Sequence, residues 1–592
     1  MKLSIIIPAH KLAPYIYECL LSVFTQRTDF DFELDVKKPP MAAVPEHLRS
    51  LCVFGIGAGG SVTALLQQRR VGHLLIFEPN PDFFYASLFQ IPWHKKLDGI
   101  KDQNGIYFNI GGDGAEYYQD LIQHIQVKGS YQLTDSFYLQ GYADGQLSTA
   151  INKLSRELLL LFTNNEYFDA ARSILAHLRA NSAQGYPFLL DSKQRKAAPI
   201  NYPVFIVGNG PSLDDSLDII RQHQGRAIVI SCSTALKTLH KAGIRPDYHM
   251  EVEIQLATHS WITQIKDADY LKQITLLSVA GVHPETAKLF RDTLMVLKKD
   301  DTCYSSFHQQ VKKLGLRLAE AAKTYPTVSN FALSVCAELG VSEVYLFGVD
   351  LGYKDPNQHH SKHSAYYKDD GKPVYDFGKV HGQSQPVAGN FQAEVLTSAS
   401  FDYARGMMES LLDDSKRTMT VFNCSDGALI QGTVPLSADK LRLSAPDATS
   451  KKSCLDLITT RYFYPLTDAE YHKVFSVFDY AKLESQLKEI ESIVNQPVES
   501  HQAAFALLSR QQDLLLRNYF SQNNLLAQLF LGETNYFSAA LCKFLDFDAT
   551  DKLVYFNAAL AVYKEFLQQA TEALRSPLAF DQADTTLFSK KP

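Results

Sequence analysis

The sequence predicts an α/β protein with a Rossmann-like N-terminal domain, a central doubly wound α/β domain and a C-terminal α-helical bundle. Two segments, 51–60 and 204–215, have the pattern of a strand that leads through a glycine turn into a helix. Strands and helices then alternate between about residues 200 and 435, which is typical of a mostly parallel sheet. Beyond about residue 455, apolar residues recur at helical spacing, and this predicts the bundle.

The 592 residues are too many for a single hydrophobic core. We expect an N-terminal segment (1–45), a Rossmann-like domain with a helical linker (46–198), a central domain (199–440) and a C-terminal helical domain (450–592). Residues 2–34 resemble the start of a family 2 glycosyltransferase, but Lys37-Lys-Pro-Pro40 follows where that family has its acidic metal site. We therefore expect a docked or leftover segment there, without transferase chemistry.

The composition indicates an ordinary soluble protein, with 46% hydrophobic residues, 21% charged residues and a net charge of −6. This charge argues against a general nucleic-acid binder. No apolar run reaches the roughly 18 residues of a membrane span. The eight cysteines are scattered without a Cys-x-x-Cys pair, which favours a reduced, cytoplasmic protein without disulfides or a zinc knuckle.

The N-terminal domain opens with a glycine-rich turn, Gly55–Gly60, after the strand that begins at Leu51. Glu78 follows about 20 residues later at the end of the next apolar run, as in a dinucleotide or S-adenosylmethionine site, where an acid accepts a ribose hydroxyl. Close packing of a helix on a sheet requires the same glycines, so both interpretations stay open. Leucines at helical spacing predict helix over 146–182.

The central glycine turn is the most informative segment. The strand Val204–Val207 leads into Gly208-Asn209-Gly210, and Pro211 and Ser212 then suit the first turn of a helix. Backbone N–H groups at such a helix start can bind a phosphate group. The segment therefore predicts a nucleotide site.

Polar clusters follow the other predicted strands of this domain, 227–231, 274–278 and 344–347. They are Ser231-Cys-Ser233, Ser278 and Gly348-Val-Asp350, and we expect them to meet Asn209 in one crevice beyond the carboxyl ends of the strands. Predicted helices cover 233–242 and 329–339. Acids near a further strand, Asp247, Glu251 and Glu253, and the glycine-rich turn 423–432 have either structural or site roles.

A segment rich in histidine and tyrosine follows Asp350. It contains His359, His360, His363, Tyr366 and Tyr367, and His381 lies further on. Tyrosine hydroxyls and Lys362 can hold phosphate oxygens, and a histidine can act as general base. The segment lacks the carboxylates or cysteines at fixed spacing that a metal site would need, so we expect no metal.

Together these motifs resemble the Maf family, the motility accessory factors. The resemblance is carried by Gly208–Leu213, Leu239–Asp247, Phe347–Leu351, His360 and its neighbours, and Asn423–Gly432. It implies a cytoplasmic protein O-glycosyltransferase that transfers a nonulosonic acid, of the pseudaminic or legionaminic type, from a CMP-activated donor to serine or threonine of flagellin. Flagellin and the CMP-sugar would be its partners, and no cofactor is implied.

The central domain also resembles family 42 sialyltransferases, which are GT-A-type, inverting and metal-independent. The resemblance implies a nucleotide site, and its candidate residues are Gly208, Asn209, Gly210, Pro211, Ser212, Ser233, Thr327, Ser329, Asn330, Asp350, Tyr353, Tyr366 and Tyr367. Ser233 replaces an asparagine of those enzymes. His381 stands about where they carry the base, and His360 is its rival.

Two other functions are compatible with the sequence. Archaeal enzymes that add diphosphate to a hydroxymethylpterin share the Gly-Asn-Gly-Pro-Ser motif, and they would need ATP and Mg²⁺, with Asp247, Glu251 or Glu253 near the metal. A non-catalytic chaperone for flagellin is the third alternative. The particular sugar, the modified sites and the oligomeric state stay open.

Overall fold

The computed structural model describes residues 44–575, apart from residues 45, 58, 92, 94–105, 129–135, 164–166, 196–198, 300, 365, 368–371, 373, 375–383, 414–418, 444–447, 477, 479, 520, 522–523 and 547–550. The glycosyltransferase-like start and His381 lie outside the described residues. The chain divides into two compact units, unit 1 (Met1–Phe162) and unit 2 (Thr163–Pro592).

Unit 1 is a parallel four-stranded sheet with the order β3-β2-β1-β4. Its strands are β1 (His47–Phe54), β2 (Arg70–Glu78), β3 (Ile106–Ile110) and β4 (Ser136–Gln140). Helix α2 (Gly60–Gln68) packs on one face, and α5 (Gly114–Lys128) and α6 (Gly145–Thr163) pack on the other. Helix α3 (Pro81–Gln90) follows β2. The predicted Rossmann-like fold is confirmed.

Helix α7 (Phe168–Ala183) belongs to unit 2, although we predicted that residues up to 198 would be part of the N-terminal domain. Asn181 Nδ2 donates to the carbonyls of Ala280 and Val282 at 3.1 and 2.8 Å, and His177 Nδ1 lies 3.0 Å from the carbonyl of Gly281. These contacts attach the helix to the loop after β9. Helical periodicity predicts an apolar face but not the core that this face covers.

The sheet of unit 2 has the order β16-β15-β12-β6-β7-β8-β9-β10-β5-β17, and β11 pairs with β10. All these pairs are parallel except β5 with β17. The strands are β5 (Phe188–Leu189), β6 (Val204–Val207), β7 (Ile228–Cys232), β8 (Tyr248–Glu251), β9 (Thr275–Val279), β10 (Asp292–Lys298), β11 (Glu320–Ala321), β12 (Glu343–Phe347), β15 (Thr420–Asn423), β16 (Val434–Pro435) and β17 (Phe463–Tyr464). The predicted strands coincide with β6, β7, β9 and β12; β10 was not predicted.

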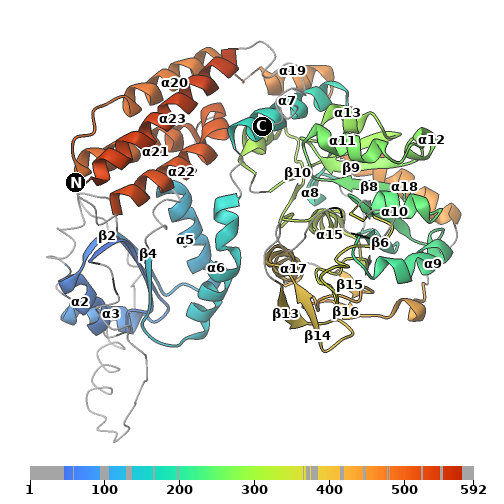
Figure 1. Cartoon of the computed structure of the whole chain (residues 1–592), viewed down its shortest axis with the longest axis horizontal. Helices are drawn as coiled ribbons and strands as arrows, with labels where there is room; N and C mark the ends of the chain where they lie inside the picture. The colour runs from blue at the N-terminus through green and yellow to red at the C-terminus, as the bar shows by residue number, and fades with distance from the viewer. Residues whose placement is uncertain are drawn as a thin grey trace, which may run out of the picture. The chain divides into compact units, whose positions relative to one another are not determined.

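Helices cover both faces of this sheet, as Figure 1 shows around β6. Val204 and Ile206 face α15 (Val328–Leu339), α17 (Ala399–Leu412) and α18 (Ala448–Arg461). Phe205 and Val207 face α9 (Leu213–His223) and α10 (Ala235–Lys241). The side chains therefore alternate between two cores, as expected of a strand that is buried on both faces.

Smaller elements complete the central part of unit 2. They are α8 (Ser192–Arg195), α11 (Leu256–Thr263), α12 (Ala268–Leu271), α13 (Pro284–Ala287), η4 (Thr302–Tyr304), α14 (Ser305–Lys313), the antiparallel pair β13 (Gln385–Ala388) and β14 (Glu394–Thr397), and η5 (Ala438–Lys440).

The strand order reverses at β6, because β7 follows it on one side and β12 lies on the other. A ligand crevice in a doubly wound sheet forms at such a reversal.

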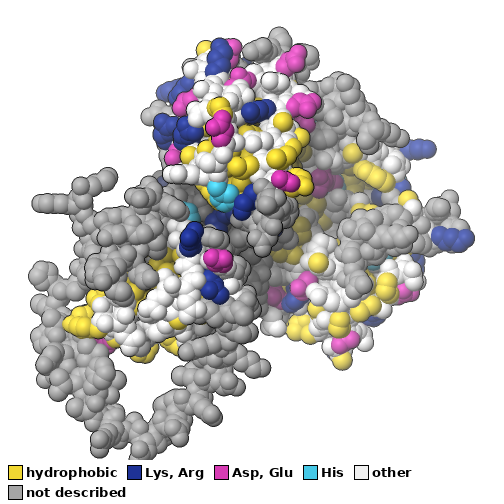
Figure 2. All heavy atoms as spheres, turned by 60° about the vertical axis from the view of Figure 1, so that its left-hand side comes forward, with side chains coloured by type: hydrophobic (Ala, Val, Ile, Leu, Met, Phe, Trp, Pro, Cys, Tyr) yellow, Lys and Arg dark blue, Asp and Glu magenta, His cyan; other side chains and the backbone are white. Residues whose placement is uncertain are grey.

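The C-terminal part of unit 2 is helical: α19 (Asp468–Phe475), α20 (Tyr480–Val494), α21 (His501–Tyr519), α22 (Leu525–Asp546) and α23 (Lys552–Arg575). The predicted apolar stripes are buried in it, with Leu487 at 3% exposure and Leu560 at 2%. Figure 2 shows Lys, Arg, Asp and Glu side chains interspersed with hydrophobic ones on the visible face of the bundle. No helix among the described residues is long and apolar enough to cross a membrane.

We expect Gly208→Ala to destabilise unit 2. A Cβ at this position would lie 2.5 Å from the carbonyl oxygen of Gly348, so the backbone of a neighbouring strand end would have to move. Overpacking of this kind costs about 1–3 kcal/mol. Thermal unfolding measures the loss, with Gly225→Ala as the matched control, because a Cβ there meets no atom within 4 Å. Equal melting temperatures for the two variants would contradict this account.

Candidate functional site

The turns that follow β6 and β12 are in direct backbone contact. The N–H of Gly208 donates to the carbonyl of Phe347, and the N–H of Gly210 donates to the carbonyl of Gly348, both at 2.8 Å. The turn after β15 joins them, because the N–H of Ala428 donates to the carbonyl of Asp350 at 2.7 Å. The ends of three adjacent strands therefore form one compact edge.

A buried carboxyl occupies the start of α9, where we predicted a phosphate. Asp350 is 3% exposed, and its Oδ2 accepts the N–H of Ser212 at 3.3 Å. Burial raises the pKa of Asp350 to about 7. Asp214, in the first turn of α9, accepts Ser361 Oγ at 2.5 Å and the N–H of Lys362 at 3.0 Å. The N–H of Ser212 therefore has a carboxyl partner, and the first turn of α9 is attached to the loop that carries Ser361 and Lys362.

Asn209 connects the turn after β6 to the start of α10. Its Nδ2 donates to Thr234 Oγ1, and its Oδ1 accepts Thr238 Oγ1, both at 2.9 Å. Ser233 lies between β7 and α10 with φ +46°, a left-handed conformation that is costly for any residue other than glycine or asparagine. The sequence analysis did not predict that Thr234 and Thr238 belong to this site. Their hydroxyl side chains, within a predicted helix, were the feature of the sequence that could have indicated it.

The histidine and tyrosine segment lies over the ends of β6 and β7. The N–H of Ser361 donates to the carbonyl of Asn209 at 2.9 Å, and Tyr366 is hydrogen-bonded to Thr234. The ring of His360 lies 4.1 Å from that of Tyr366. Tyr367 Oη accepts the N–H of His360 at 3.2 Å. Burial raises the pKa of both Tyr366 and Tyr367, so both phenols stay protonated at neutral pH.

Other predicted site residues have partners within the fold. Thr327 caps α15, and its Oγ1 donates to Asn330 Oδ1 at 2.7 Å, while Asn330 Nδ2 donates to the carbonyl of Ala404 at 2.8 Å. Tyr353 Oη lies 2.8 Å from Ser384 Oγ, and its backbone pairs with Leu396 in β14. Ser329 is hydrogen-bonded to Cys232 at the end of β7.

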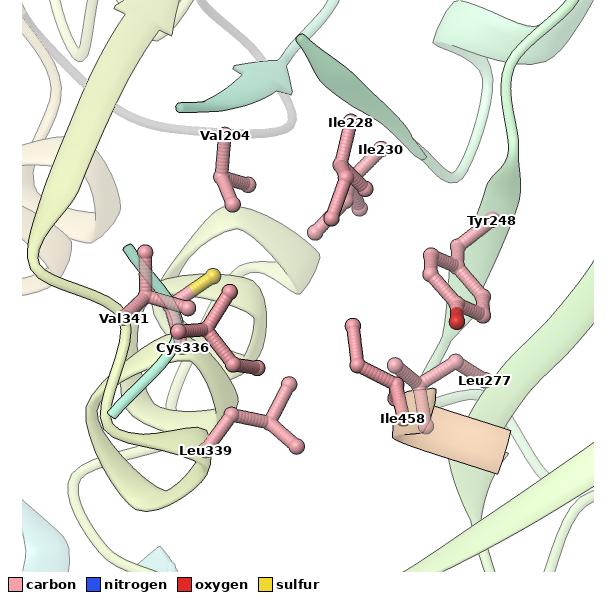
Figure 3. A pocket seen from close by; sticks show the side chains of 10 residues that line it. Val204, Ile228, Ile230, Tyr248, Leu277, Cys336, Leu339, Val341 and Ile458 are labelled. Carbon is pink, nitrogen blue, oxygen red and sulfur yellow. The ribbon is translucent and has the colours of Figure 1, made fainter. Parts of the chain in front are cut away.

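An apolar cavity of about 10 Å³ lies at the opposite ends of the strands (Figure 3). Val204, Ile228 and Tyr248, which line it, are the first residues of β6, β7 and β8. A space of this size holds one water at most, and an apolar lining gives a water no partners. We therefore place the candidate site at the carboxyl edge.

The glycine turn of unit 1 is closed by its own acid. Glu78 Oε2 accepts the N–H groups of Ile56 and Gly57 at 2.7 and 3.3 Å, and Oε1 accepts the N–H of Asn80 at 2.8 Å. The phenol of Tyr142 also donates to Oε1. This carboxylate, for which we considered a ribose contact, therefore stabilises the turn itself.

Comparisons with known proteins agree with this architecture. The glycosyltransferase Maf N-terminal domain matches residues 13–163, and the 6-hydroxymethylpterin diphosphokinase MptE-like domain matches residues 173–356. The solved Maf glycosyltransferase of Magnetospirillum magneticum AMB-1 has a TM-score of 0.68 and 24% identity, over 90% of this chain and 80% of that chain. No curated protein matches the sequence.

The matched N-terminal domain is one that Maf glycosyltransferases carry, and the fold of the chain is similar to that of a solved member of that group. The chain carries the N-terminal domain and the overall fold of a Maf glycosyltransferase, which confirms the resemblance seen in its motifs. The boundary of the matched domain at residue 163 coincides with the end of unit 1.

We expect Asp350→Asn to stabilise the protein increasingly as the pH rises from about 4 to 7. The folded state keeps the Asp350 proton up to about pH 7, whereas the unfolded chain releases it near the ordinary value of 3.8. Between these values the folded state binds more protons, so the unfolding free energy of the wild type falls as the pH rises, by up to about 1.4 kcal/mol per pH unit.

Unfolding midpoints of both proteins between pH 4 and 8 measure this difference. It should level off above pH 7, where Asp350 is ionised in both states. The exposed neighbour Asp355→Asn serves as the control for the substitution itself. A constant difference across the range would show that Asp350 is ionised throughout.

Proposed function

We propose that this protein is an O-glycosyltransferase that transfers a nonulosonic acid from a CMP-activated donor to serine or threonine of flagellin in the cytoplasm. The convergence of Asn209, Thr234, Tyr366 and His360 at the carboxyl edge of the central sheet supports this most strongly. The match to the Maf N-terminal domain supports the transferase class.

In this proposal the cytidine phosphate lies near Asn209 and Thr234. His360 takes the proton of the acceptor hydroxyl, whose oxygen forms a bond to the anomeric carbon while the bond from that carbon to the phosphate oxygen breaks. The reaction inverts the anomeric centre in one displacement. Tyr366 and Tyr367, which stay protonated at neutral pH, donate hydrogen bonds to the departing phosphate in place of a metal ion.

The MptE-like match favours a second candidate, an ATP- and Mg²⁺-dependent diphosphate transfer. Of the acids that we considered for its metal, Asp247 is ruled out by position. It precedes the first residue of β8, and its Oδ2 binds Lys451 Nζ and the N–H of Val229, both at 2.7 Å. Glu251 and Glu253, at the carboxyl end, are the acids that remain for this alternative.

We expect CMP to raise the melting temperature of the full chain, and ATP with Mg²⁺ or S-adenosylmethionine to leave it unchanged. A ligand at 100 times its Kd adds about 2.7 kcal/mol to stability. Asn209→Ala should remove most of this response, and the exposed Asn495→Ala should retain it. A response to ATP with Mg²⁺ alone would favour the diphosphate transferase, and no response to any ligand would favour the flagellin chaperone.

We expect alanine at the catalytic histidine to lower the transfer rate by about 10²- to 10⁴-fold while CMP still binds, because a general base contributes by this amount. His360→Ala and His381→Ala are compared, with His472→Ala in α19 as the control. Flagellin and the CMP-sugar serve as substrates. Full activity in both His360→Ala and His381→Ala would refute the assignment of a histidine base.

A further inference from the structure

A chain of three buried polar side chains connects β7 to the end of β8. Ser231 Oγ lies 2.8 Å from His249 Nδ1, and His249 Nε2 lies 3.1 Å from Glu251 Oε1. Ser231 and His249 are 0% exposed and Glu251 is 2% exposed. The ring of His249 also stacks on Phe290 at 5.3 Å, which fixes its plane.

An ionised carboxylate only accepts hydrogen bonds, so with Glu251 ionised the Nε2 of His249 donates to it. In a neutral ring Nδ1 then accepts the hydrogen bond of the Ser231 hydroxyl. The backbone of Glu251 is held as well, because Ser278 Oγ donates to its carbonyl at 2.7 Å. The position of the Glu251 carboxylate is therefore determined before any ligand binds.

The second oxygen of this carboxylate has no such partner. Oε2 of Glu251 is buried, and no hydrogen-bond donor contacts it among the residues that the structure describes. Leaving a buried polar atom without a partner costs about 1–3 kcal/mol, and more for a charged group. Asp301 Oδ2 is the other buried carboxylate oxygen of this kind among the described residues, and it lies 3.7 Å from Lys298 Nζ, whereas no such cation faces Glu251 Oε2.

Glu251 lies at the same edge as the candidate nucleotide site. It ends β8, which is two strands from β6 and therefore about 10 Å away from the glycine turn. Tyr366 is related to both places: its phenol is hydrogen-bonded to Thr234, and burial together with the negative charge of Glu251 raises its pKa. If the phosphate of a nucleotide or nucleotide-sugar binds near Asn209, the ribose or the sugar of that ligand is long enough to contact Glu251.

We propose that Glu251 is a ligand-binding residue whose free oxygen accepts a hydrogen bond from a hydroxyl group, either on the ribose of the nucleotide or on the transferred sugar. His249 and Ser231 hold the carboxylate in the position that this bond requires. The proposal rests on the proposed function, because the hydroxyl belongs to the ligand of that site.

Titration calorimetry on the full chain tests this with CMP, 2′-deoxy-CMP, ATP and 2′-deoxy-ATP. The variants are Glu251→Gln and Glu251→Asp, and the exposed Glu285→Gln is the control. Aspartate keeps the negative charge, but its shorter side chain moves the carboxylate away from the ligand. If Glu251 binds the ribose, Glu251→Gln lowers the affinity for the ribonucleotide about 10- to 100-fold. The wild type then prefers the ribonucleotide over the deoxynucleotide, and the variant does not.

If the sugar is bound instead, both variants retain nucleotide affinity but raise the KM for the CMP-sugar by a similar factor. If both Glu251 variants keep the nucleotide affinity and the transfer kinetics of the wild type, the assignment of Glu251 is wrong and the proposed function is unaffected. A wild-type chain that binds neither CMP nor ATP would overturn this assignment and the proposed function together.

Discussion

The contact between the backbones of Gly208 and Gly348 is the constraint on which the site depends. These residues directly follow β6 and β12, the two strands at which the order of the central sheet reverses. A side chain at either position would collide with a carbonyl oxygen of the other turn. Because both are glycines, the turns close on each other, and the loops that follow them meet above the sheet. The histidine and tyrosine segment is one of these loops.

This closure leaves polar groups in a nearly dry environment, where each needs a partner. Asn209 bonds to two threonine hydroxyls, and Asp350 accepts the N–H of Ser212 at the start of α9. These bonds make the edge rigid, and rigid polar groups are suited to hold a transition state without rearranging. Glu251 differs from them, because one of its oxygens is held by His249 and the other has no donor among the described residues.

The two glycine turns of the chain show why a motif alone does not predict a ligand. A strand, a glycine turn and a helix predict unpaired N–H groups at the turn. In unit 1, Glu78 accepts those N–H groups, and in unit 2 Asp350 accepts that of Ser212 at the start of α9. Glu78 ends the strand next to its turn, Asp350 follows the strand next to its turn, and Asp350 is 138 residues away from Ser212 in the sequence. Its role is visible only once strands β6 and β12 are known to be neighbours.

The sequence by itself determined the fold class, the strands β6, β7, β9 and β12, the apolar stripes of the bundle and the family resemblance. These depend on local spacing of apolar residues and glycines, which a single segment contains. The tertiary structure decided which unit α7 covers, that Asp350 occupies the helix start predicted for a phosphate, and that Asp247 lies at the wrong end of its strand. It also assembled Ser231, His249 and Glu251 into one chain of hydrogen bonds. Such relations depend on which strands pair and on which face each side chain lies, and both result from packing between distant segments.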